Sequence, residues 1–137
     1  MGFALRLALA FGLSATLALQ ASPSLKTAAS QGNLEAIKMN LAEGKNINEP
    51  DSNGWTPLMW AINNRQIAAA DLLLNHGADP NLQATDSCKS YLKGATALIL
   101  AAADGQEDAI KALHRKNAKI DLSDINGWTP LMWAVYY

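Results

Sequence analysis

The chain has 137 residues, enough for one domain, and its 50% hydrophobic and 17% charged residues indicate a folded protein with a buried core. Its 11 Lys and Arg and 12 Asp and Glu residues give a net charge of −1 and are scattered singly or in pairs. This pattern excludes a basic face for nucleic acid and an acidic tail, so no nucleic-acid partner is expected.

Residues 1–21 have the layout of a secretory signal peptide. Arg6 precedes an apolar run over residues 7–19, and small residues follow it up to Ala21. The run is shorter than the roughly 20 residues of a membrane-spanning helix, so a retained anchor is the weaker alternative. We expect cleavage after Ala21, with cleavage after Ala18 as an alternative. The mature protein is then exported, periplasmic or extracellular, and has no stable membrane insertion.

The octapeptide GWTPLMWA occurs twice, at residues 54–61 and 127–134, which indicates an internal repeat. The glycine that opens it recurs as Gly54, Gly94 and Gly127. These spacings fit a repeat of about 33 residues with one insertion. Four units align in the domain at 22–137: an incomplete first over about 24–50, a second over 51–83, a third over 84–123 and a partial fourth over 124–137.

Each unit is predicted to contain a turn and a short first helix. Asn53 and Gly54 form a pair that favours a tight turn. Thr56 is expected to cap the following helix, and Pro57 suits its first position, where the missing N–H costs nothing. Ser22 or Ser24 is expected to cap the first helix of unit one in the same way. Leu58 belongs to the apolar face of the first helix in unit two.

A second helix follows in each complete unit. In unit two its apolar face carries Ile67, Ala70 and Leu74. The aligned ends of the second helices are Gly44, Gly77 and Asn117. Gly and Asn are the residues that most readily adopt the left-handed conformation that ends a helix. The pattern therefore predicts a series of helical hairpins.

Unit two resembles the ankyrin repeat, a unit of about 33 residues with the pattern DxxGxTPLHxAAxxGHxxIVxLLLxxGADxN. The matching residues are Asp51, Gly54, Thr56, Pro57, Leu58, Ala61, Leu72 to Leu74 and the GADPN of 77–81. The resemblance implies an all-α solenoid of stacked helix-turn-helix units joined by β-hairpin-like loops, with about three units and a partial fourth. It also implies a non-catalytic module that binds a partner protein through hairpin tips and first helices.

Several positions depart from the pattern. Met59 and Met132 replace the family's His, and Ala97 replaces its Pro. Asn40 and His114 stand where Leu is usual, and we expect His114 to be half-buried. These departures predict a looser solenoid than the consensus one.

The seven-residue insertion lies within ATDSCKSYLKG, at 84–94, where Cys88 and Tyr91 are expected to be exposed. Insertions in repeat proteins collect on loops and often on the binding face, but a spacer without a role is the favoured interpretation. Cys88 is the single cysteine, so an internal disulfide is excluded. A redox or cross-linking role is the alternative to an incidental thiol.

No catalytic, metal or cofactor site is predicted. The two histidines, His76 and His114, end different second helices, where they can interact with the last carbonyl groups. Two histidines and one cysteine in separate units match no familiar metal-ligand spacing. Glu107 and Asp108 begin a helix, where the dipole favours negative charge. We therefore expect no enzyme activity.

The predicted partner-binding surface combines hairpin tips, the ends of first helices and the C-terminal edge. The alternative for the two tryptophans at the tips, Trp55 and Trp128, is that each indole covers the neighbouring hairpin. Trp60 and Trp133 are assigned to packing between units. The predicted contact residues are Ser52, Asn53, Trp55, Asn63, Asn64, Asp104, Gln106, Ile125, Asn126, Trp128, Tyr136 and Tyr137.

The partial fourth unit has a first helix but no second helix, so Leu131 and Val135 are expected to be bare on one side. Exposed apolar edges often mark association sites. The second functional hypothesis is therefore a structural or regulatory subunit that self-associates through Trp133, Val135, Tyr136 and Tyr137. A frayed end or a truncated longer array would explain the same edge.

Overall fold

The computed structural model describes residues 21–85 and 92–137, and every element in these ranges is a helix. The all-α expectation is thereby confirmed. Nearly all of the predicted signal peptide, together with Cys88 and Tyr91, lies outside the described residues. The helices are α3 (Leu25–Gln31), α4 (Leu34–Ala42), α5 (Pro57–Asn63), α6 (Ile67–Asn75), α7 (Ala97–Ala103), α8 (Glu107–Arg115) and α9 (Pro130–Tyr136).

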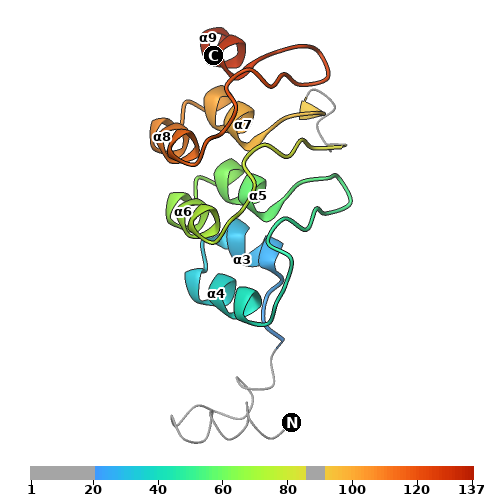
Figure 1. Ribbon diagram of the computed structural model, residues 1–137, viewed down its shortest axis with the longest axis vertical. Helices are drawn as coiled ribbons and strands as arrows, with labels where there is room; N and C mark the ends of the chain where they lie inside the picture. The colour runs from blue at the N-terminus through green and yellow to red at the C-terminus, as the bar shows by residue number, and fades with distance from the viewer. Residues whose placement is uncertain (1–20, 86–91) are drawn as a thin grey trace, which may run out of the picture.

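The helices stack in two columns, with long loops projecting to one side (Figure 1). The first helices α3, α5, α7 and α9 form one column, and each contacts the next. The second helices α4, α6 and α8 form the other column. Each complete unit is an antiparallel pair, α3 with α4, α5 with α6 and α7 with α8. The helix α9 packs against α7 and has no second helix in its unit.

Side-chain caps start the first helices. The hydroxyl of Thr56 accepts the N–H of Met59 at 3.3 Å, and Pro57 occupies the first turn. Ser24 caps α3 by accepting the N–H of Thr27 at 3.2 Å. Both predicted caps are confirmed. Helices of seven residues are marginal alone, so their stability depends on packing against neighbouring units.

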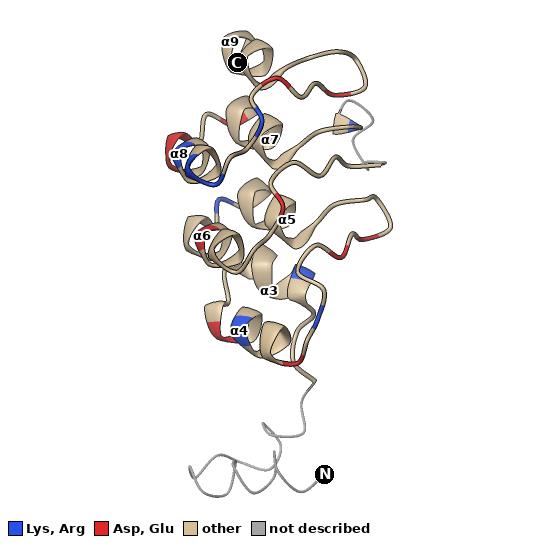
Figure 2. Cartoon of the chain, viewed as in Figure 1, with Lys and Arg blue, Asp and Glu red and all other residues tan. Residues whose placement is uncertain are grey.

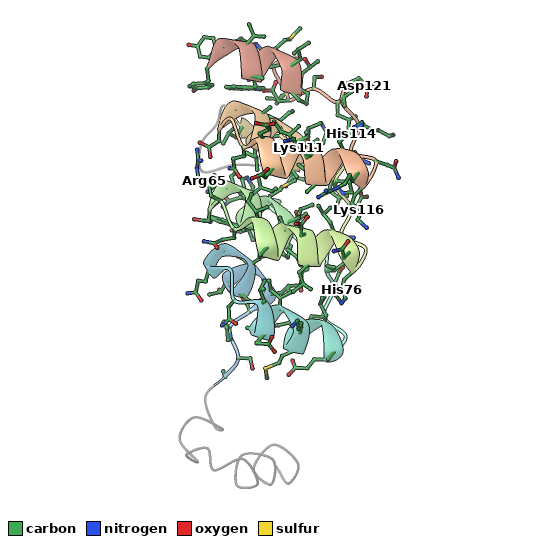
Figure 3. The ribbon with its side chains drawn as sticks, turned by 90° about the vertical axis from the view of Figure 1, so that its left-hand side faces the viewer. Arg65, His76, Lys111, His114, Lys116 and Asp121 are labelled. Carbon is green, nitrogen blue, oxygen red and sulfur yellow. The ribbon has the colours of Figure 1, made fainter. Side chains whose placement is uncertain are left out.

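The predicted left-handed residues after the second helices are also confirmed. Gly44, Gly77 and Asn117 have φ of 78°, 93° and 61°. The chain then turns into the loop that leads to the next unit. In this region His76 is exposed, and its Nδ1 lies 2.8 Å from the Leu72 carbonyl oxygen. His114 is exposed and not half-buried, because the end of α8 faces solvent beside the other exposed basic residues (Figure 3).

One carboxylate organises each copy of the repeated octapeptide. Asp51 Oδ1 accepts the backbone N–H of Asn53 at 2.9 Å and of Trp55 at 3.0 Å. Its Oδ2 accepts the indole N–H of Trp60 at 2.9 Å. In unit four, Asp124 Oδ1 accepts from Asn126 and Trp128, and its Oδ2 accepts from Trp133 at 2.9 Å. The aspartate therefore joins the hairpin to the first helix in both copies.

The core lies between the two columns and between successive units. Leu58 is 1% exposed and Leu74 is 4% exposed, as the repeat alignment predicts. The first helices meet through small residues, and Ala28, Ala61 and Ala101 are fully buried. Small side chains at these positions let consecutive helices approach closely.

Polar side chains link the loops of consecutive units. Asn48 Oδ1 accepts the N–H of Asp79 at 2.9 Å, and Asn81 Oδ1 accepts the N–H of Lys119 at 2.7 Å. Asn48 and Asn81 occupy the same place in units one and two. These hydrogen bonds repeat with the fold and fix the spacing between neighbouring units.

Candidate functional site

Several of the predicted contact residues line a cleft of about 490 Å³ where α5, α7 and α9 meet the loop of unit three. We call it the inner cleft. Its polar side chains come from the ends of α5 and α7, and its aromatic ones from α9. The residues that line it are Asn63, Arg65, Leu92, Leu100, Ala103, Asp104, Trp133 and Tyr137.

An ion pair crosses one side of the inner cleft. The Arg65 guanidinium lies 2.9 Å from Asp104 Oδ1 and donates to the Asp104 backbone carbonyl at 3.1 Å. Both side chains are well exposed, at 65% and 46%, so the pair is open to an incoming polar group. Figure 3 shows Arg65 at the opposite end of the second helices from His76.

Arg65 holds an unfavourable backbone conformation. Its φ is 56°, in the left-handed region. The equivalent turns of units one and three place Gly32 and Gly105 there, with φ of 69° and 61°. A non-glycine residue pays about 1–2 kcal/mol in this conformation. In place of the glycine of the other units, Arg65 supplies a guanidinium group that lines the cleft.

The opposite wall of the cleft is aromatic. Trp133 and Tyr137 stack with ring centroids 6.0 Å apart and an interplanar angle of 8°. Trp128 and Tyr136 extend this wall, with centroids 5.4 Å apart in an edge-to-face arrangement. A second hollow of about 380 Å³ lies between these four rings and Asn126. Aromatic rings beside a charged pair can hold both apolar and polar groups of a protein ligand.

The structure brings several predicted contact residues together. Asn63, Asp104 and Tyr137 line the inner cleft, and Asn126 and Tyr136 line the hollow beside it. The others are spread over the hairpins and turns. Ser52, Asn64 and Ile125 are exposed, whereas Asn53 and Trp128 are half-buried. Their role in binding stays a prediction.

The assignment of Trp55 to the contact surface is wrong for this structure. Its side chain is 4% exposed, because unit three covers it. The neighbouring Gly54 lies so close to the backbone of Thr85 that a side chain at this position would have no room. The alternative, in which the indole is covered within the stack of hairpins, is the correct one for Trp55.

Gln106 is also unavailable to a partner. It is 6% exposed, and its Nε2 donates to the Ile62 carbonyl at 2.8 Å and to Asp104 Oδ2 at 2.7 Å. The side chain thus reaches back to unit two and ties α8 to α5. It is a link between units, and it also orients the carboxylate that pairs with Arg65.

Trp133 was expected both in packing between units and at an exposed edge. It is 7% exposed, so the packing assignment holds and the exposed-edge assignment is wrong. Its indole N–H is turned inward to Asp124. Leu131 and Val135, in contrast, are 72% and 79% exposed, as predicted.

Sequence reasoning missed Arg65, Leu92, Leu100 and Ala103 as cleft residues. The signal for Arg65 was present, because the repeat alignment places it opposite Gly32 and Gly105. A charged residue at a position that requires positive φ is worth noting even without a structure. The three apolar residues carried no comparable signal, since core and cleft positions look alike in a helical pattern.

A second charged group lies beside Trp60. Lys26 Nζ is 3.0 Å from Asp51 Oδ2 and 4.8 Å from the centre of the Trp60 ring. Burial has the largest single effect and raises the pKa of the Asp51 carboxyl, whereas the hydrogen bond from Lys26 lowers this pKa. The N–H groups of Trp55, Asn53 and Trp60 lower it further. The pKa of Asp51 therefore lies below its ordinary 3.8, and the carboxylate stays ionised at neutral pH.

Charges elsewhere form small groups of both signs over the helices and loops (Figure 2). Among residues 21–85 and 92–137, no set of three or more His, Cys, Asp or Glu side chains is arranged to hold a metal ion. In the same ranges, no helix has the length and apolar character needed to cross a membrane.

Helix pairs stacked in two columns and joined by hairpin-like loops define a helical repeat solenoid, a class whose extended surfaces bind other proteins. The chain belongs to the ankyrin-repeat family. A family model described as "Ankyrin repeats (3 copies)" matches residues 9–84 and 82–137. The family assignment made from unit two is thus confirmed, and membership indicates a protein-binding domain.

Individual relatives agree with this assignment. The chain is 34% identical to palmitoyltransferase akr1 of Schizosaccharomyces pombe in an alignment of 142 positions. The alignment covers 83% of this chain and 22% of that protein. It is 33% identical to human cyclin-dependent kinase inhibitor 2A over 107 residues, covering 78% of this chain and 64% of that protein. The crystal structure of the human ASB11 ankyrin repeat domain superposes with a TM-score of 0.68 at 31% identity, covering 82% of this chain and 48% of that one.

The chain therefore spans less than two thirds of each of these proteins. What they share with it is the repeat domain. The activities in their names belong to those proteins.

Proposed function

We propose that this protein is a non-catalytic binding module that holds a partner protein in the inner cleft and against the neighbouring hairpin tips. The observation that carries the proposal is the composition of the cleft. It places an exposed Arg65 and Asp104 pair opposite the stacked rings of Trp133 and Tyr137. A groove of this kind suits a protein segment with a polar group next to an apolar side chain.

The relatives support a binding role. One of them is named as an inhibitor of a cyclin-dependent kinase, and it shares most of its length with this chain. Another is named as a palmitoyltransferase, but this chain spans only 22% of it. We propose that the present chain has no enzyme activity of its own and needs no cofactor.

We further propose that binding takes place outside the cytoplasm, in the periplasm or the extracellular medium. The support is the sequence of residues 1–21, with Arg6, the apolar run and Ala21. A single experiment can address both compartment and partner. The protein is recovered from the exported fraction, its N-terminus is sequenced, and proteins bound to it are identified. A chain that starts at Ser22 supports export, whereas an intact Met1 on a cytosolic protein contradicts it.

The binding surface is tested with Arg65→Gly. This change removes the guanidinium from the cleft, relieves the left-handed strain and loses an exposed ion pair. The strain and the ion pair offset each other to within about 1 kcal/mol, so the fold should be retained. We expect a partner captured by the wild-type protein to be lost or bound at least tenfold more weakly.

Arg115→Ala is the matched control. Arg115 lies on α8 and approaches Asp71 at 3.8 Å, away from the cleft. Its removal deletes an exposed basic side chain of the same type. Equal binding by the wild-type protein and both variants would show that the inner cleft is not the binding surface.

Self-association is the second candidate function, and a specific observation favours it. The exposed side of α9 carries Leu131 and Val135 at 72% and 79% exposure. This surface is separate from the polar side of the inner cleft. The two functions can therefore coexist in one molecule.

A further inference from the structure

The inner cleft contains a charged side chain whose hydrogen-bonding capacity is largely unused. Only one nitrogen of the Arg65 guanidinium, Nη2, has partners, and both are on Asp104: its Oδ1 at 2.9 Å and its backbone carbonyl oxygen at 3.1 Å. An arginine side chain has five N–H groups, so those on Nε and Nη1 are left to donate elsewhere. None of residues 21–85 and 92–137 accepts a hydrogen bond from them.

The carboxylate of Asp104, in contrast, is already in use on both oxygens. Its Oδ1 pairs with Arg65, and its Oδ2 accepts from Gln106 Nε2 at 2.7 Å. Because Gln106 is buried and also donates to the Ile62 carbonyl at 2.8 Å, it holds the carboxylate in one orientation. The carboxylate thus anchors one edge of the guanidinium, and the Arg65 side chain stays 65% exposed.

Asn63 supplies a second donor in the same cleft. It is the last residue of α5, its side chain is exposed, and it lines the inner cleft together with Arg65. Its carboxamide has no hydrogen-bond partner in the part of the chain that the structure describes. One incoming group with two acceptor oxygens can therefore accept from both residues.

The backbone of Arg65 is an independent indication that its side chain is used. Its φ of 56° lies where units one and three have Gly32 and Gly105. Strained residues of this kind cluster at binding sites, where the side chain is needed in spite of the strain. An exposed ion pair adds little to stability, so the pair with Asp104 does not by itself explain an arginine at this position.

The unused donors favour a carboxylate over a cation. A carboxylate accepts charge-assisted hydrogen bonds from a guanidinium, and these are stronger than hydrogen bonds between neutral groups. An ammonium group would instead meet the positive charge of Arg65. Glu107 and Asp108 line a different hollow beside Arg65 and not the inner cleft. Glu107 is also paired with Lys111 at 2.7 Å, and Asp108 is exposed, so solvent and salt screen their effect on the cleft.

We propose that the inner cleft binds an acidic side chain of the partner protein, whose carboxylate accepts hydrogen bonds from Arg65 and Asn63. This inference rests on the proposed binding role of the cleft and adds the chemistry of the ligand, a protein segment that presents an Asp or Glu residue. The residues that carry it belong to units two and three, which have neighbouring units on both sides. Gln106 acts through Asp104 and is a positioning residue.

The test selects binders to the purified chain from a library of random peptides displayed on phage. The selected peptides should share an Asp or Glu at one position. In a synthetic copy of such a peptide, replacing this residue with Gln or Lys should weaken binding about tenfold or more, measured by isothermal titration calorimetry. Added salt should weaken binding of the acidic peptide more than binding of its Gln counterpart.

Arg65→Gln removes the charge and keeps a polar side chain at the same place in the turn. This variant should bind the acidic peptide about tenfold more weakly, or worse, and should no longer prefer it to the Gln counterpart. Arg115→Gln is the matched control, because Arg115 lies outside the cleft and approaches Asp71 at 3.8 Å. It should bind both peptides as the wild-type protein does, and circular dichroism checks that both variants are folded.

The outcomes separate this inference from the proposed function. Selected peptides that need Arg65 but carry no acidic residue, or that prefer a basic one, would overturn the carboxylate ligand and leave the inner cleft as the binding site. Peptides that bind wild type and Arg65→Gln equally would overturn both the ligand and the site. A library that yields no binder would count against both as well.

Discussion

In units two and four, a single aspartate carboxylate links the turn to the first helix by hydrogen bonds. Asp51 receives two backbone N–H groups, one indole N–H and the Lys26 ammonium. Asp124 has the first three of these contacts, and among the described residues no cation lies within salt-bridge distance of it. Unit three has Leu100 where Trp60 and Trp133 stand, so it contains no equivalent indole donor. In both copies of the octapeptide, the second tryptophan is therefore held by the aspartate that precedes the turn.

Replacing Asp51 with Asn should destabilise the protein in a pH-dependent way. The pKa of Asp51 is lowered in the folded state, so its charge stabilises the fold above the unfolded-state pKa and this contribution is lost as the pH falls through the lower folded-state pKa. At pH 7 we expect Asp51→Asn to cost about 1.5–3 kcal/mol, the usual value of hydrogen bonds to a charged group.

Urea unfolding of both proteins across the acid range checks this prediction. The difference between them should be constant above about pH 5 and shrink below about pH 4, where the unfolded-state carboxyl is protonated before the folded-state one, whose pKa is lower. Glu35→Gln serves as the control, because Glu35 forms only an exposed ion pair with Lys38. A difference between wild type and Asp51→Asn that does not change with pH would show that the charge of Asp51 does not stabilise the fold.

At the scale of the helix, α5 and α9 share most of their sequence but differ in which side chains are buried. The segment PLMWA begins both α5 and α9 and is capped by threonine in both. Leu58 is nevertheless core, whereas Leu131 is exposed. Local sequence thus fixes the helix and its cap, and the neighbouring units determine which of its sides is buried.

This contrast gives a matched pair of mutations. Leu58→Ala should reduce the free energy of unfolding by about 2–5 kcal/mol, and Leu74→Ala by a similar amount, because both remove buried methyl groups. Leu131→Ala, the same change at the same place in the octapeptide, should stay within about 0.5 kcal/mol in dilute protein. Asn63→Ala should be equally mild.

Denaturant unfolding at low protein concentration measures these differences. Equal losses for Leu58→Ala and Leu131→Ala would mean that α9 is covered in the monomer.

For the whole molecule, rules that relate neighbouring residues predicted the helix caps and the turns after the second helices correctly. Thr56, Gly77 and Asn117 were assigned correctly because caps and left-handed residues depend on chemistry within a few positions. The location of Trp55 depended on how the start of unit three covers unit two at Gly54 and Thr85. That contact joins residues about 30 positions apart, and no local pattern encodes it. The same limit applies to Gln106, whose hydrogen bond reaches back to Ile62.

The candidate site was predicted only in part for a related reason. Asn63 and Asp104 were named because the family resemblance implies contacts from the first helices, and Tyr137 because it belongs to the apolar C-terminal edge. Arg65 was missed because the family pattern has Gly at this position, and a turn glycine carries no expectation of a contact. Leu92 and Leu100 become cleft residues only when three units are stacked, so they are a property of the assembled solenoid.

The one-sided packing of α9 also has a consequence for motion. In a linear stack each unit is held by its neighbours, so a unit covered on one side opens more often than one covered on both. Amide hydrogen exchange should therefore be faster in residues 130–136 than in residues 57–63, although the two helices share most of their sequence. Because intrinsic exchange rates depend on local sequence, this comparison isolates the effect of packing. Exchange by mass spectrometry at low protein concentration measures it, and equal protection of the two helices would contradict it.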